Sequence, residues 1–151
     1  MKLNHLWSSA VLVVASCGGS GTAPELELTR NLARWQESRP ASYVYALERL
    51  CFCAGFGVAR VTVEDAEVID VAWVDPEAQG AQQPSANEFP SVDGLFEILA
   101  EAMGRDAHVI EVTYDPVSGV PMEFFIDYVE HAVDEELRMR VTEPVSRLAG
   151  P

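Results

Sequence analysis

Lysine is almost absent from this chain, and its absence limits what the surface can bind. The one lysine, Lys2, lies at the N-terminus, so nine arginines supply the other positive charges against 24 acidic residues. A formal net charge of −14 without a basic cluster disfavours binding to nucleic acid or to anionic lipid headgroups. We therefore expect no nucleic-acid partner and a solvated acidic surface that keeps the domain soluble, with attraction of cations or of a basic protein as the alternative.

Catalytic motifs are also missing. The 151 residues contain no Gly-x-Ser-x-Gly, no His-Glu-x-x-His and no phosphate-binding loop. His108 shares a predicted strand face with Ile110 and Val112, where we expect it to be buried or half-buried, and His131 lies in an acidic segment without a serine or cysteine partner. The sequence therefore predicts no catalytic residues, no cofactor and a protein that is not an enzyme.

The sequence also lacks an apolar segment long enough to span a bilayer. Crossing a membrane takes about 20 apolar residues, and the longest apolar segment, residues 6–14, is much shorter and is interrupted by two serines. It lies between Lys2 and the stretch Val14-Ala15-Ser16-Cys17, which resembles the lipobox of bacterial lipoproteins. We therefore predict a signal peptide over residues 1–16 and acylation of Cys17.

The segment after Cys17 predicts how a folded domain would be held at the membrane. Residues 17–25 are rich in glycine and small side chains, which is typical of a flexible tether. Several acyl chains on Cys17 would make the anchoring effectively permanent, and Gly18 after the cysteine favours the outer membrane, with the domain facing the periplasm or the surface. Without residues 1–16 the nine arginines and 24 acidic residues give a formal charge of −15.

Apolar periodicity predicts an α+β domain over residues 26–145, followed by a C-terminal tail, 146–151. Spacings of three and four residues favour two helices, one from Pro24 to Ser38 and one from Ser91 to Gly104. Alternation predicts strands over residues 42–50, 58–64, 68–74, 107–114, 120–128 and 136–142, with a long loop over 75–89. This helix-three-strand pattern, present twice, predicts a single antiparallel sheet of about six strands, two helices on one face and an open opposite face.

Cys51 and Cys53 are the only thiols left once Cys17 carries lipid. In an oxidising envelope a structural disulfide is the default state, although a bridge between residues two apart needs a bend in the chain. Reduced thiols, a redox-active pair and a metal site that also uses histidines remain alternatives.

Acidic residues near two predicted turns are candidate cation ligands. Asp115 begins a segment, Asp115-Pro116-Val117-Ser118-Gly119, that is typical of a hairpin turn. Asp127, Asp134, Glu135 and Glu136 lie before and within a later charged turn, where oxygen ligands for calcium could converge. No EF-hand spacing is present, so solvated turns explain the same residues.

The order of several short motifs resembles a family of uncharacterised bacterial lipoproteins, described only as a domain of unknown function. The resemblance covers about residues 28–142, and it implies location and architecture without an activity. The motifs are Trp35, Tyr43-x-Tyr45, Cys51-x-Cys53, Val92-Asp93-x-Leu95-Phe96, Tyr114-Asp115-Pro116-x-x-Gly119-x-Pro121, Ile126-Asp127 and Val133-Asp134-Glu135-Glu136.

Three functional hypotheses follow from these observations. The first is a membrane-anchored envelope lipoprotein whose domain is a non-catalytic binding module that uses an open sheet face; an exposed aromatic patch there would support it. The second is a metal-binding or redox protein built on Cys51 and Cys53. The third is a structural lipoprotein that a cation stabilises through its acidic turn.

Overall fold

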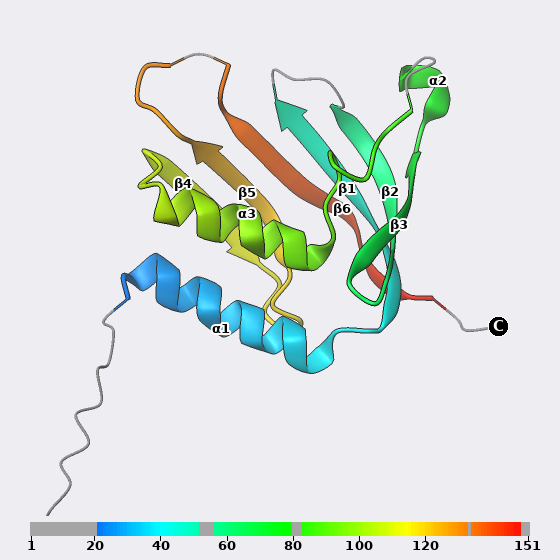
Figure 1. Ribbon diagram of the computed structural model, residues 1–151, viewed down its shortest axis with the longest axis horizontal. Coiled ribbons are helices and arrows are strands. Elements are labelled where there is room, and N and C mark those ends of the chain that lie inside the picture. Colours follow the sequence, from blue (N-terminus) through cyan, green and yellow to red (C-terminus); the bar gives the residue numbers. More distant parts are fainter. Residues whose placement is uncertain (1–20, 52–55, 80–82, 133, 149–151) are drawn as a thin grey trace, which may run out of the picture.

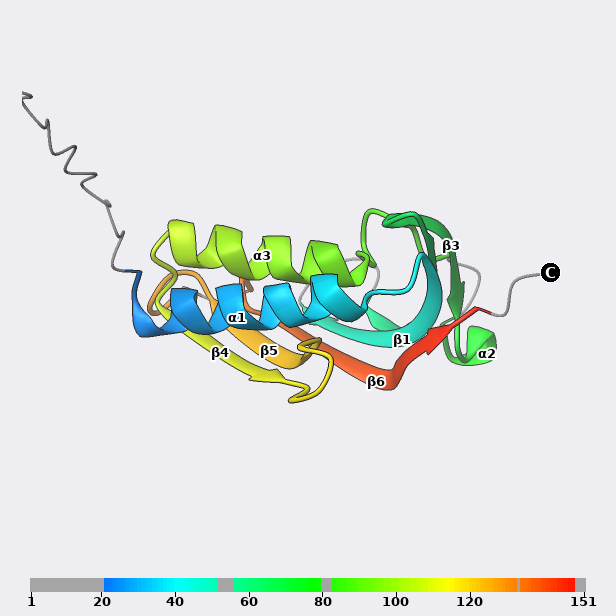
Figure 2. The same ribbon diagram turned by 90° about the horizontal axis from the view of Figure 1, so that it is seen from below.

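The computed structural model describes residues 21–51, 56–79, 83–132 and 134–148. They form an α+β fold with one six-stranded antiparallel sheet and two long helices on one of its faces (Figures 1 and 2). The fold class predicted from the sequence is confirmed. The elements, in chain order, are α1 (Ala23–Ser38), β1 (Ser42–Cys51), β2 (Gly57–Glu64), β3 (Glu67–Trp73), α2 (Pro76–Gln79), α3 (Val92–Gly104), β4 (Val109–Tyr114), β5 (Pro121–Asp127) and β6 (Leu137–Arg147).

Both long helices begin at side-chain caps. Thr22 and Glu25 form a capping box at the start of α1, where the Thr22 N–H donates to Glu25 Oε2 at 2.6 Å. The Ser91 hydroxyl accepts a hydrogen bond from Gly94 N at 3.2 Å at the start of α3. The helix predicted from Pro24 therefore begins one residue earlier, at Ala23, and residues 23–25 of the predicted tether segment form its first turn.

The strand order is β3-β2-β1-β6-β5-β4. Each half of the chain forms a meander, and the halves join where β1 pairs with β6, with Cys51 opposite Leu137. The first strand of one half thus meets the last strand of the other, so the repeated pattern does not produce a two-fold arrangement of equivalent strands. The β2–β3 turn has positive φ at Asp65 and Ala66, as expected of a tight hairpin.

Two local predictions differ from the structure. The segment 75–89 contains the four-residue helix α2 rather than loop alone. Strand β6 continues past Thr142 to Arg147 and includes Pro144, because the pairing with β1 steps from Glu143 to Ser146 and leaves Pro144 out of the register. A proline that donates no hydrogen bond is tolerated at such an irregularity.

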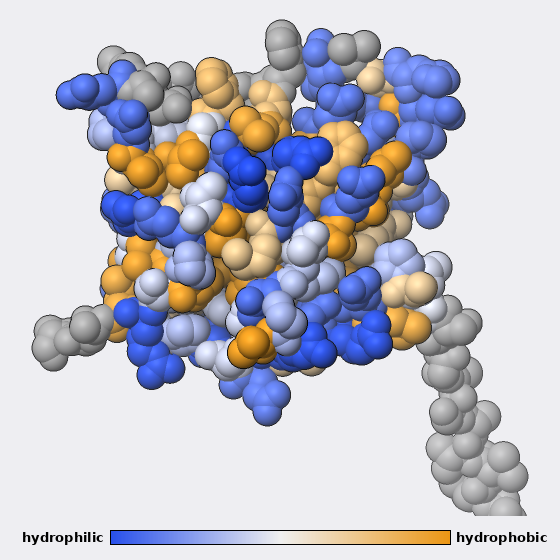
Figure 3. All heavy atoms as spheres, turned by 180° about the vertical axis from the view of Figure 1, so that it is seen from behind, coloured by the Kyte–Doolittle hydropathy of each residue, from blue (hydrophilic) through white to orange (hydrophobic). Residues whose placement is uncertain are grey.

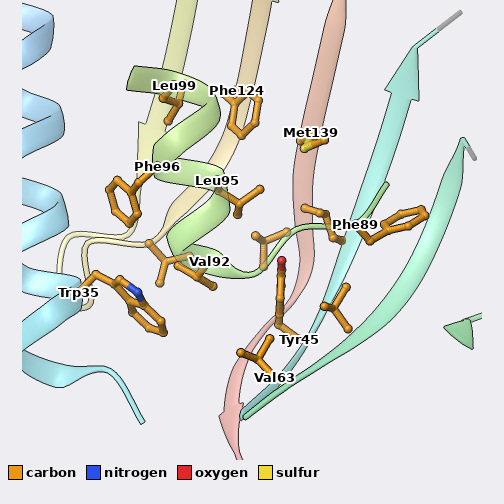
Figure 4. Close-up of a cluster of buried hydrophobic side chains, with 14 of the residues drawn as sticks. Trp35, Tyr45, Val63, Phe89, Val92, Leu95, Phe96, Leu99, Phe124 and Met139 are labelled. Atoms are coloured by element: carbon orange, nitrogen blue, oxygen red, sulfur yellow. The ribbon is translucent and has the colours of Figure 1, made fainter. Parts of the chain in front are cut away.

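The core fills the space between the sheet and the helices (Figure 4). Tyr43, Tyr45, Phe124 and Met139 point from the strands toward Leu95 and its neighbours on α3, and all are at most 3% exposed. Trp35 of α1 packs edge-on against Tyr43 with ring centroids 5.4 Å apart. One face of the sheet therefore supplies the strand side of the hydrophobic core.

Candidate binding surface

The face of the sheet opposite the helices is uncovered among the described residues, and we refer to it as the open face (Figure 2). Cross-strand register assigns its side chains, because residues alternate between the faces of each strand. From β3 to β4 they include Asp70, Ala72, Arg60, Thr62, Val44, Glu48, Leu50, Glu143, Arg140, Arg138, Glu123, Phe125, Asp127, Glu111 and Thr113.

Three arginine–glutamate pairs join strands on the open face, two of them between neighbouring strands and the third, Arg60–Glu143, between β2 and β6 across β1. Arg140 Nε donates to Glu48 Oε2 at 2.9 Å, Arg138 lies 2.7 Å from Glu123, and Arg60 lies 3.1 Å from Glu143. The arginine side chains are 44–51% exposed. Ion pairs this exposed contribute at most about 1 kcal/mol each to folding stability, so these three pairs stabilise the fold only slightly.

Apolar side chains on the open face lie between these charges. The Arg138 guanidinium covers the Phe125 ring, 5.1 Å from its centroid, and Leu50 is 42% exposed. Figure 3 shows hydrophilic side chains across the middle of this face with hydrophobic ones interspersed. The face therefore carries a mixed polar and apolar surface rather than an exposed aromatic patch.

One end of the open face is hollowed where β1 and β6 pair. Leu50, Cys51, Phe125, Asp134, Glu136 and Arg138 line this hollow. Cys51, which is half-buried, is disulfide-bonded. Cys17 and Cys53 lie outside the described residues, so the pairing of Cys51 with Cys53 stays a prediction. The structure brings Cys51 together with Asp134 and Glu136, which the sequence treated as separate features.

The candidate cation ligands lie in two places. The carboxylate of Asp115 accepts hydrogen bonds from Val117 N at 3.1 Å and from Ser118 N at 2.6 Å, and the bonds from Ser118 contribute most to lowering the pKa of Asp115. This turn and the charged segment before β6 lie at opposite ends of the sheet (Figure 1). Asp115 therefore acts as a turn cap far from the other acidic candidates.

The acidic candidates near β6 are dispersed as well. Asp127 Oδ1 accepts from Val129 N at 3.2 Å, Asp134 and Glu136 line the hollow, and Glu135 has a buried Oε1 without a hydrogen-bond partner among the described residues. Within those residues, no three histidine, cysteine or acidic side chains converge as a metal site would require.

Neither histidine takes part in such a cluster in the described ranges. His108 is exposed and precedes β4, so the expectation of a buried or half-buried residue on the strand face is wrong. The positive φ of Asp106 turns the chain just before His108 and delays the start of the strand. His131 is 88% exposed and lies 3.5 Å from Glu130.

Several residues that carry the family resemblance fasten the helices to the sheet. The Tyr43 hydroxyl accepts a hydrogen bond from Val92 N at 3.1 Å, and the Tyr45 hydroxyl donates to the Pro90 carbonyl. Asp93 accepts from Trp35 Nε1 at 3.3 Å and from Arg39 at 2.7 Å. These motif residues have structural roles on the covered side.

The sequence analysis did not single out Arg60, Arg138 or Arg140. A signal for two of them was present in Leu137-Arg138-Met139-Arg140-Val141, where strict alternation places the arginines on one face of a strand. Their glutamate partners come from β1 and β5, and Arg60 pairs with β6. Only the strand order reveals these cross-strand pairs.

Comparison with known proteins identifies the family of the chain. No curated protein and no solved structure matches the chain. In the parts of the chain that the structure describes, no helix is both long and apolar enough to cross a membrane. The model of a family of unknown function, DUF6174, matches residues 27–145, which span α1 to β6. The chain therefore belongs to DUF6174.

Proposed function

We propose that this protein is a lipid-anchored, non-catalytic binding module of the bacterial cell envelope. Acylated Cys17 holds it at the membrane, and the open face of the sheet contacts a partner protein. The observation that carries the proposal is the contrast between a face packed under two helices and a face whose side chains are exposed or half-buried on all six strands.

The composition of the open face suits protein recognition. Arginine and aromatic side chains are enriched at protein interfaces, and Arg138 over Phe125 offers both. The arginines are held in place by glutamates on neighbouring strands. A partner therefore meets side chains whose positions are already largely fixed, which lowers the entropic cost of binding.

Charge indicates the chemistry of the partner. Three arginines on the open face are paired with three glutamates, whereas Glu111, Asp70 and Asp127 on the same face have no ion-pair partner among the described residues. The whole chain is also strongly acidic. The partner that fits best is a protein with a basic surface, because complementary charge speeds association and suppresses wrong partners.

The lipid anchor is tested by the mass of the intact protein extracted from membranes. The proposal predicts a protein that starts at Cys17 and carries acyl chains, and a Cys17→Ser variant that leaves the membrane fraction. An unacylated protein with residues 1–16 retained would contradict it. Alkylation of the same sample without reductant, under denaturing conditions, reports whether Cys51 and Cys53 are closed in a disulfide.

The binding surface is tested by photo-crosslinking in the producing bacterium. A photoreactive residue at Glu143 would lie on the open face, and one at Ala100 would lie on exposed α3 as a matched control. The proposal predicts a discrete protein adduct from position 143 only. The adduct's partner is then purified and its affinity measured directly. Equal adducts from both positions, or none from position 143, would contradict an open-face interface.

A further inference from the structure

A groove on the helix side of the molecule has a different character from the open face. It lies between α1 and β4, and β4 is the last strand at one edge of the sheet (Figure 1). Its lining consists of Glu27, Arg30, Asn31 and Arg34 from α1, Val112, Thr113 and Tyr114 from β4, and Pro116.

One wall of the groove is a free sheet edge. Within the described ranges β4 has a neighbouring strand only on its β5 side. Alternate N–H and C=O groups of an edge strand point away from the sheet, where an extended peptide can pair with them. The groove therefore offers backbone hydrogen bonding along one side.

The other wall presents positive charge. Residues 27, 30, 31 and 34 share one side of α1 because they recur at helical spacing. Arg30 and Arg34 form no ion pair with the described residues, whereas five other arginines pair with carboxylates. Two guanidinium groups without an ion pair among the described residues therefore lie in one groove of a strongly acidic chain.

Asn31 fixes one of these arginines. It is only 5% exposed, its Nδ2 donates to the Glu27 carbonyl at 3.0 Å, and its Oδ1 accepts from Arg34 at 2.8 Å. The β4–β5 turn closes the groove beside it, since a Cβ on Gly119 would lie 2.3 Å from the Asn31 carbonyl oxygen. Arg34 is thus held in place near a closed end.

Tyr114 adds a donor without a partner. Its hydroxyl oxygen is buried and has no hydrogen-bond partner among the described residues, although a buried hydroxyl normally has one. Burial, with a smaller effect of Glu27, raises the pKa of Tyr114 to about 12. The hydroxyl therefore keeps its proton at physiological pH and can donate it to a ligand oxygen.

We propose that this groove binds an extended, acidic peptide segment of another protein, which adds to β4 as a further strand and places a carboxylate against Arg30 and Arg34. Glu27 opposes such a ligand, so the groove keeps one net positive charge from these three side chains. Of its lining residues only Thr113 also belongs to the open face, and the two arginines that carry the proposal lie on α1.

A hexapeptide, Thr-Val-Glu-Val-Glu-Val-amide, with a fluorophore on its N-terminal nitrogen tests the proposal against the full-length protein in detergent by fluorescence anisotropy. A second peptide has glutamine in place of both glutamates. The acidic peptide is expected to bind about tenfold more tightly than the glutamine peptide, because the charged contacts are lost in the latter. No binding of the acidic peptide at millimolar concentration, or equal binding of both peptides, would overturn the proposal.

Variants of groove residues test whether the peptide binds in the groove. The double variant Arg30→Gln, Arg34→Gln is expected to weaken binding of the acidic peptide about tenfold, because it removes two positive charges from the groove. Glu27→Gln is expected to strengthen binding about threefold, because it removes a negative charge that repels the peptide. Glutamine keeps the propensity of α1 to be helical, and urea unfolding checks that each variant is folded. Arg60→Gln on the open face is the control and should bind normally. Loss of binding with Arg60→Gln alone would overturn the groove assignment.

Discussion

The two faces of the sheet differ in what holds their side chains in place. On the covered face Tyr43, Tyr45 and Phe124 are at most 1% exposed and pack against the helices. On the open face Arg138 and Arg140 are about half exposed and meet glutamates of neighbouring strands. Buried apolar contacts contribute far more to stability than exposed ion pairs, so folding depends mainly on the covered face, whereas the proposed binding uses the open face.

The largest expected difference in the free energy of unfolding is between alanine variants of two adjacent residues, Phe124 and Phe125. Phe124 is 1% exposed in the core, and Phe125 lies on the open face under Arg138. Phe124→Ala should lower the free energy of unfolding by about 3–5 kcal/mol through the cavity it creates. Phe125→Ala should lower it by about 1 kcal/mol or less, as is usual at a surface. Urea unfolding of both variants measures this difference. Equal losses of unfolding free energy would contradict the claim that the covered face contributes most of the stability.

The next largest difference in stability is expected between alanine variants of two glycines. Gly119 has a φ of +79° and a Cβ there would lie 2.3 Å from the Asn31 carbonyl oxygen, whereas a Cβ on Gly104 meets nothing within 4 Å. Gly119→Ala should destabilise by about 1–3 kcal/mol or more, because it adds backbone strain and a clash. Gly104→Ala, at the end of α3, should be neutral or stabilise by up to about 1 kcal/mol. Thermal unfolding checks both, and a harmless Gly119→Ala would contradict the close approach of this turn to α1.

The tyrosines of the covered face predict how stability changes with pH. Burial raises the pKa of Tyr43 to about 12 and that of Tyr45 well above its usual value. In the unfolded chain these hydroxyls ionise near pH 10, so their contribution is complete below about pH 10 and is lost as the pH rises toward about 12. Urea unfolding at about pH 9 and about pH 11 should show this loss, and Tyr43→Phe should make it smaller. A stability that rises over the same interval would contradict the burial of these groups.

Calcium should have the smallest effect of all. Asp115 and the acidic residues before β6 lie at opposite ends of the sheet, and no described group of three ligands converges. A cation that bound the native state alone would raise the melting temperature by mass action. We expect the same melting temperature in calcium and in chelator. A clear increase with calcium would revive the hypothesis of a cation-stabilised lipoprotein.

Local chemistry in the sequence predicted most of the elements. The helix start at Ser91, the break between the strands 58–64 and 68–74 and the alternation along the strands depend on residues a few positions apart. The pairing of β1 with β6 joins residues nearly 90 positions apart, such as Cys51 and Leu137, and no local pattern specifies it. The hollow beside Cys51 and the Arg140–Glu48 and Arg60–Glu143 pairs depend on that pairing, which is why the sequence analysis missed them.

The groove between α1 and β4 was missed for the same reason. Arg30 and Arg34 are ordinary residues of an amphipathic helix in the sequence. Their significance depends on β4 being the last strand of the sheet and on the Gly119 turn packing against Asn31.

The most direct test of the central claim compares one charge change on each side of the molecule. Glu111 is exposed on the open face and Glu97 is exposed on α3. Glu111→Lys should weaken binding of the purified partner about tenfold through like-charge repulsion, and should change the free energy of unfolding by no more than about 0.5 kcal/mol. Glu97→Lys should leave both unchanged. Equal losses of binding in the two variants, or none with Glu111→Lys, would contradict a binding function for the open face.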